Sequence, residues 1–91
     1  MEETYSITVT GNVQGVFFRQ TTKEKADKLG LKGTVENKED ESVVIIATGP
    51  KEQLDELVKW CHEGPPRAKV ENVIVQKIPL QEFYSFSIKR W

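Results

Sequence analysis

Residues 11–19, with the sequence GNVQGVFFR, are the part of this chain whose residue types could bind an anion. Glycine lets a backbone turn tightly and lets a ligand approach the main chain closely. Unpaired N–H groups at a helix N-terminus, together with the helix dipole, favour negative charge at that position. Arg19 adds a permanent cation whose planar guanidinium matches the geometry of phosphate oxygens. These residues therefore indicate a cradle for a phosphate or a carboxylate.

The spacing of the two glycines does not by itself establish a site. Turns with two glycines are common, and short motifs of this kind match by chance in many chains. The stretch lacks the Gly-Lys-Ser/Thr of a Walker A loop and the third glycine of a dinucleotide-binding fingerprint. On these residues alone, a plain structural turn and an anion cradle both stay open.

The residues on either side of this stretch predict a strand before it and a helix after it. Residues 4–13 alternate between apolar and polar side chains, which is the period of a half-buried strand. Apolar and small residues recur at helical spacing over residues 18–29, and Gly30 is expected to end that helix. The glycine-rich stretch is thus predicted to be a strand-to-helix turn with Arg19 at the start of the helix.

The rest of the chain predicts three more long elements and a short terminal strand. Residues 31–37 and 42–48 have the composition of two strands, and the short polar turn between them predicts an antiparallel hairpin. A second helix is expected from Gly49-Pro50 to Gly64, with an apolar stripe on one face. Residues 70–78 predict a fourth strand, and alternation around residues 84–88 predicts a short C-terminal one.

This order is β-α-β-β-α-β plus a short C-terminal strand, the ferredoxin-like, split β-α-β sandwich of an α+β protein. We expect an antiparallel sheet with both helices on one of its faces, because each helix has only one apolar stripe to bury. The length of 91 residues is that of a single small domain. Since this architecture hosts many functions, the fold alone predicts none of them.

Composition and charge restrict the partners. Thirteen basic and fourteen acidic side chains leave a net charge of −1, so we expect no general attraction to nucleic acid or to anionic membranes. A single cysteine excludes an intrachain disulfide and any cysteine-pair metal site. The sequence shows no apolar run of membrane-spanning length, and we expect no signal peptide. We therefore expect a cytoplasmic monomer that binds neither nucleic acid nor membrane.

Four segments, taken together, resemble the acylphosphatase family. Residues 11–19 are similar to the signature of that family, and residues 33–37, GTVEN, look like its second motif at the expected distance. Residues 64–70 and 86–89 resemble its later, weaker segments. The resemblance covers nearly the whole chain, and it identifies residues 1–91 as one acylphosphatase-like domain.

The resemblance implies hydrolysis of small-molecule acyl phosphates to a carboxylate and inorganic phosphate, without a metal or another cofactor. It implies that Arg19 binds the phosphate through its guanidinium, while backbone N–H groups of the loop bind it as well. It also implies that Asn37 holds the attacking water, a role that suits an amide able both to accept and to donate hydrogen bonds. The loop residues are Gln14, Gly15, Val16, Phe17 and Phe18.

Two departures from the family's pattern bear on substrate affinity. The hairpin that follows Asn37 has no glycine, and three acidic residues, Glu39, Asp40 and Glu41, lie near it in the sequence. If these carboxylates face the cradle, they repel a phosphate dianion, although solvent screens part of that repulsion. Asn12 stands where a basic residue is frequent in the family.

A second hypothesis is a non-catalytic anion-binding or regulatory module of the same fold, which would keep the anion site without useful turnover. RNA binding ranks low, because the predicted central strands lack paired aromatic residues and the surface is not basic. Among the remaining side chains, Cys61 is expected to be buried and His62 to lie on the surface. Tyr84, Phe86 and Trp60 are expected to pack in the core or at its rim.

Overall fold

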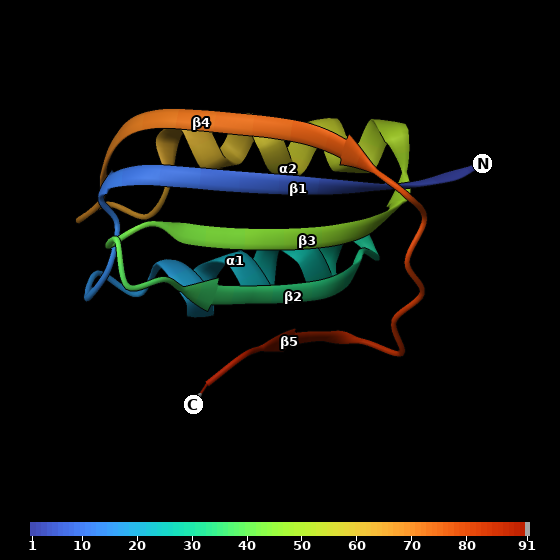
Figure 1. Cartoon of the computed structure of the whole chain (residues 1–91), viewed down its shortest axis with the longest axis horizontal. Helices are drawn as coiled ribbons and strands as arrows, with labels where there is room; N and C mark the ends of the chain where they lie inside the picture. Colours follow the sequence, from blue (N-terminus) through green and yellow to red (C-terminus); the bar gives the residue numbers. More distant parts are fainter. Residues whose placement is uncertain (91) are drawn as a thin grey trace.

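The computed structural model describes residues 1–90 and confirms the ferredoxin-like α+β architecture, with two helices on one face of a five-stranded sheet (Figure 1). The predicted boundaries differ from the observed ones by only a few residues at each end. The elements are β1 (Glu2–Asn12), α1 (Phe18–Leu29), β2 (Lys32–Asn37), β3 (Val43–Pro50), α2 (Lys51–Glu63), β4 (Lys69–Ile78) and β5 (Phe86–Ile88).

The strand order across the sheet is β4-β1-β3-β2-β5. Strand β1 pairs antiparallel with β3 and β4, and β2 pairs antiparallel with β3. Strand β5 pairs parallel with β2, so the sheet is mixed. The predicted antiparallel sheet therefore holds for the four long strands and not for β5. The reason is topological: the chain leaves β4, crosses the end of the sheet to the opposite edge and returns in the direction opposite to β4, which is the direction of β2 (Figure 1).

Hydrogen bonds among two threonine hydroxyls and two backbone groups of Gln81 hold this crossover against the sheet. The hydroxyl groups of Thr4 and Thr48 are 2.7 Å apart and buried. Thr48 donates to the carbonyl of Gln81 at 2.8 Å, and the N–H of Gln81 donates to the hydroxyl of Thr4 at 2.9 Å. Because Gln81 lies in the segment between β4 and β5, this ring of contacts helps to place β5 beside β2.

Both helices begin and end where the sequence indicates. Gly30 ends α1 in the left-handed conformation, with φ 73°, and its N–H reaches the carbonyls of Ala26 and Asp27. Helix α2 begins directly after Pro50 and ends at Gly64, whose N–H donates to the Trp60 carbonyl at 2.8 Å. Neither helix is long and apolar enough to span a membrane, as judged over residues 1–90.

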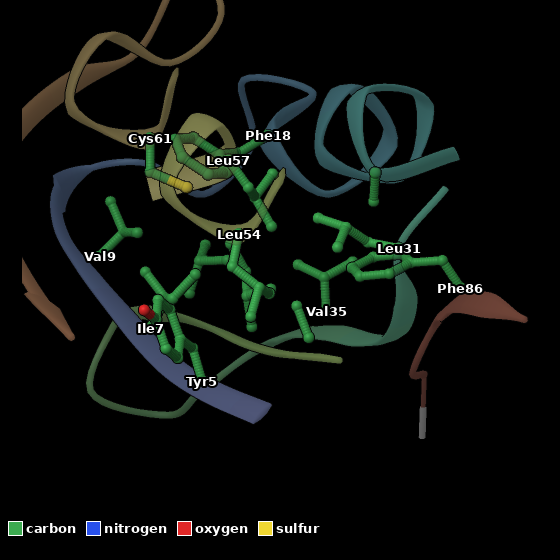
Figure 2. Close-up of a cluster of buried hydrophobic side chains, with 14 of the residues drawn as sticks. Tyr5, Ile7, Val9, Phe18, Leu31, Val35, Leu54, Leu57, Cys61 and Phe86 are labelled. Atoms are coloured by element: carbon green, nitrogen blue, oxygen red, sulfur yellow. The ribbon is translucent and has the colours of Figure 1, made fainter. Parts of the chain in front are cut away.

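The hydrophobic core is a single layer between the sheet and the helices. Figure 2 shows side chains from β1, β2 and α2 meeting in this layer, and Phe18 of α1 packs at its edge against Trp60 with ring centroids 5.3 Å apart. Cys61 is fully buried, as predicted. The prediction was wrong for Tyr84, which is exposed because it precedes β5 and lies outside the ladder. The largest buried side chains are Phe18, Phe86, Ile7, Leu31, Ile45, Leu54 and Leu57.

Candidate active site

The loop between β1 and α1 has the backbone geometry of an anion-binding turn. Gly15 and Phe17 both adopt the left-handed conformation, with φ 74° and φ 65°, on either side of Val16. Left-handed residues among ordinary ones turn successive N–H groups toward one side, which makes a concave site for an anion. The first α1 hydrogen bond runs from the N–H of Thr21 to the carbonyl of Phe17 at 3.0 Å. The N–H groups of the first helical turn therefore have no partner within the helix.

Phe17 adopts this conformation at a cost that glycine does not have. A left-handed backbone brings Cβ close to the following carbonyl, and bulky residues seldom adopt it. The side chain of Phe17 is 72% exposed, so burial of the ring does not offset that cost. Strain of this kind is concentrated at functional sites. The glycine at position 15 indicated a tight turn in the sequence, whereas no sequence signal indicated the left-handed backbone of Phe17.

A cavity of about 410 Å³ opens beside this loop and contains both predicted polar site residues. Arg19 reaches it from the first turn of α1, and Asn37 from the last residue of β2. The loop contributes Gly15, Phe17 and Phe18 to its wall. The other lining residues are Val13, Gln20, Ile88 and Arg90.

The amide oxygen of Asn37 is buried and accepts no hydrogen bond from any described residue. A buried acceptor without a partner costs free energy, and the few that occur in native proteins call for an explanation. A water molecule in the cavity would satisfy this oxygen, because Asn37 is one of the residues that line it. The side chain is therefore suited to hold a water beside the anion-binding loop.

A second, smaller hollow of about 310 Å³ adjoins the first and is lined by Arg19, Asn37, Lys89 and Arg90. The Nζ atom of Lys89 forms an ion pair with the carboxylate of Glu36, with an N···O distance of 3.9 Å. No acidic residue lines either hollow within the described part of the chain, so the local charge favours an anion.

The sequence interpretation missed Arg90. Its only signal was a pair of cations after the last strand, which has meaning only once β5 lies next to β2.

The acidic hairpin between β2 and β3 faces elsewhere. Glu39 and Asp40 line a larger hollow of about 690 Å³ with Thr8, Lys38, Ser42 and Val44, and neither Arg19 nor Asn37 lines it. Hydrogen bonds from the hydroxyl and the N–H of Ser42, at 2.6 and 3.0 Å, hold the pKa of the Asp40 carboxyl below its usual value. The larger hollow mixes acidic groups with one lysine, so it is the poorer anion site despite its size.

Glu41 replaces the missing glycine by adopting the conformation that glycine would favour. Its φ is 72°, and its N–H donates to the Lys38 carbonyl at 3.1 Å. The N–H of Lys38 in turn donates to the Ser42 carbonyl at 2.9 Å, which closes the hairpin. The turn is therefore formed without glycine, at the cost of a strained glutamate.

The predicted loop residues divide by burial. Val16 and Phe18 are buried, whereas Gly15 and Phe17 are exposed. Gly15, Phe17 and Phe18 line the cavity, whereas Val16 and Gln14 are not among its lining residues. Gln14 differs from these four, because its side chain leaves the loop and contacts the hairpin. Its Nε2 donates to the carbonyls of Lys38 and Ser42, both at 2.9 Å.

Comparisons with known proteins identify relatives along almost the whole chain. The family model described as Acylphosphatase matches residues 5–88. The acylphosphatase of Marinobacter nauticus is 48% identical over 83 residues, which are 90% of this chain and 90% of that protein. That of Rubrobacter xylanophilus is 52% identical over 71 residues, which are 78% of this chain and 64% of that protein. The crystal structure of the Bacillus subtilis acylphosphatase superimposes with a TM-score of 0.93 at 38% identity, covering 99% of this chain and 100% of that one.

Proposed function

This chain belongs to the acylphosphatase family, and on that premise we propose that it hydrolyses acyl phosphates to a carboxylate and inorganic phosphate in the cavity between the loop and Asn37. The observation that supports this site most directly is the buried, unpartnered amide oxygen of Asn37. It lines the same cavity as Arg19 and the left-handed loop. One cavity thus has groups for an anion and a group for a water.

The phosphate is bound by the loop and by Arg19. Backbone N–H groups of residues 14–18 point at the phosphoryl oxygens, and the guanidinium of Arg19 adds two parallel hydrogen bonds. Phosphoryl transfer spreads charge over the three equatorial oxygens, so fixed donors there stabilise the transition state. Because α1 and β1 hold the loop, these donors need little reorganisation when the charge develops.

Asn37 positions the water. Its Oδ1 accepts a hydrogen bond from the water, and its Nδ2 donates toward the phosphoryl group. The water oxygen attacks phosphorus, the bond from phosphorus to the acyl oxygen breaks, and the carboxylate leaves with the electron pair. Both protons of the water stay on the phosphate product, so no side chain has to act as a strong base. Because the carboxylate is a good leaving group, the protein's main contribution is position and charge.

The protein acts on small molecules as a single-domain monomer in the cytoplasm. It needs no metal or other cofactor, because Arg19 and the loop N–H groups supply the positive charge that a metal ion supplies in other phosphoryl-transfer sites. The acidic turn residues Glu39 and Asp40 do not weaken phosphate binding strongly, since they line a different hollow. The substrate pocket is open to solvent along the exposed ring of Phe17.

Hydrolysis of benzoyl phosphate in the presence of EDTA, followed by ultraviolet absorbance, tests this function. We expect turnover by the wild-type protein and none above background in the Arg19→Ala variant. Folding of both proteins is checked by circular dichroism. A folded wild-type protein that binds inorganic phosphate but does not hydrolyse benzoyl phosphate would instead be an anion-binding module. Turnover that EDTA abolishes would contradict the metal-free mechanism.

A further inference from the structure

We propose that the side chain of Gln14 is a positioning residue, which sets the hairpin carrying Asn37 relative to the phosphate-binding loop. This inference rests on the proposed function, because it assigns Gln14 an effect on the water that Asn37 holds. The sequence predicts that Gln14 contributes to the loop mainly through its backbone. The structure adds a contact of its side chain with another element.

Both N–H groups of the Gln14 amide are used in this contact. They reach the carbonyls of Lys38 and Ser42, each at 2.9 Å. Lys38 follows Asn37 directly in the chain, and Ser42 precedes Val43, the cross-strand partner of Asn37. One amide therefore holds both arms of the hairpin at the pair of residues next to Asn37.

The contact lies where the sheet no longer couples the two elements. The ladder between β1 and β3 ends at the pair Val9–Val43, so backbone hydrogen bonds do not tie the residues beyond Val9 to the hairpin. The loop after β1 and the β2–β3 hairpin lie at the same end of the sheet (Figure 1). Gln14 spans the gap between them. Its amide thereby relates the position of the phosphate to that of the water.

Loss of this amide should not unfold the hairpin. The Lys38 carbonyl also accepts from the N–H of Glu41 at 3.1 Å, and the Ser42 carbonyl from the N–H of Lys38 at 2.9 Å. Neither carbonyl is left without a partner when Gln14 is replaced, so the usual penalty for an orphaned buried acceptor is avoided. The expected consequence is a displaced hairpin rather than an unfolded one.

The test is Gln14→Met, which keeps the length of the side chain and removes both donors. We expect kcat to fall between about tenfold and a hundredfold, since small misplacements of reacting groups cost this much. The inhibition constant for inorganic phosphate should change little, because the loop N–H groups and Arg19 remain. Gln76→Met is the matched control, as Gln76 is exposed on β4 away from the cavity, and it should leave kcat unchanged.

A double-mutant cycle distinguishes positioning from a general loss of structure. In the Asn37→Ala background, whose residual turnover is followed at high enzyme concentration, Gln14→Met should cause no further loss of kcat. An equal loss in both backgrounds, or a parallel weakening of phosphate binding, would overturn the proposal. Gln14→Met with wild-type kcat would overturn the positioning role alone. An Asn37→Ala variant with wild-type kcat would overturn both this role and the proposed use of Asn37.

A second variant, Gln14→Glu, provides a readout that a purely structural role would not move. At neutral pH its carboxylate would lie against the carbonyl oxygens of Lys38 and Ser42 and repel both. We expect a larger loss of kcat than for Gln14→Met, and partial recovery as the pH falls and the new carboxyl becomes a donor. A kcat ratio to wild type that is independent of pH would count against the proposal.

Discussion

Arg19 and Asn37 line the same cavity, although the first belongs to the opening turn of α1 and the second to the last residue of β2. The cavity therefore contains a permanent cation and a buried amide oxygen that has no hydrogen-bond partner among the described residues. In the proposed mechanism, charge neutralisation and water positioning therefore belong to two different elements of the fold. The two side chains can be replaced one at a time.

This division of roles predicts different kinetics for the two variants. Asn37→Ala should lower kcat by about 10²–10³-fold, the typical effect of removing one polar group that acts in the transition state. It should leave the inhibition constant for phosphate close to wild type, whereas Arg19→Ala should weaken phosphate binding as well. Steady-state kinetics with phosphate as a competitive inhibitor measures both quantities. Equal weakening of phosphate affinity in the two variants would show that the roles are not separate.

Glu41 predicts a stabilising substitution. With φ 72° it holds a conformation that costs a non-glycine residue about 1–2 kcal/mol, which glycine avoids at a smaller cost in unfolded-state entropy. Glu41→Gly should therefore raise the free energy of unfolding by up to about 1 kcal/mol. Glu39→Gly, in the same turn but without a positive φ, is the control and should be neutral or destabilising. Urea denaturation compares them, and a stabilised Glu39→Gly with an unstabilised Glu41→Gly would contradict the argument.

Gly33 predicts a severe defect. A Cβ at this position would overlap the carbonyl oxygen of Ile46, a backbone atom that cannot move away cheaply, and its φ is 150°. Gly33→Ala should therefore abolish folding or reduce the free energy of unfolding by more than about 4 kcal/mol. At Gly15, with φ 74°, a Cβ meets open space, so Gly15→Ala should cost only the strain of about 1–2 kcal/mol. Similar losses in the two variants would argue against the close approach seen at Gly33.

The buried thiol of Cys61 predicts a change of stability with pH. Burial raises the pKa of this thiol to about 12, so the folded state retains the proton after the unfolded state has lost it. The resulting contribution is fully present below the pKa of the unfolded thiol, near 9.0, and is lost as pH rises toward 12. Its slope is about 1.4 kcal/mol per pH unit. Cys61→Ala should have a shallower decline above pH 9 in denaturation experiments, and parallel curves would refute the assignment.

The threonine ring at the crossover predicts a loss of stability at a distance from the cavity. Thr48→Val removes the hydroxyl that donates to the Gln81 carbonyl at 2.8 Å and that contacts the buried hydroxyl of Thr4 at 2.7 Å. The free energy of unfolding should fall by about 1–3 kcal/mol. Thr34→Val, on β2, is a matched control and should have little effect, since the Thr34 hydroxyl makes no side-chain hydrogen bond within residues 1–90. Thermal or urea denaturation measures both, and equal stability of the two variants would contradict a structural role for the ring.

Much of the fold could be predicted from local patterns. The helices were placed closely because their apolar spacing, their proline and their terminal glycines are signals within a single element. The direction of β5 could not be predicted in this way. A short strand of three residues carries no mark of its partner, and its parallel pairing with β2 depends on where the crossover returns to the sheet.

The candidate site shows the same division. The amino-acid sequence by itself determined the glycine-rich turn, the cation at the helix start and the asparagine at a strand end, because these depend on residue type and near spacing. Only the tertiary structure decided that Arg90 borders the cavity, that Glu39 and Asp40 line a different hollow, and that Gln14 reaches the hairpin. Each of these joins segments far apart in the chain. Such contacts are set by strand order and register, which local periodicity does not specify.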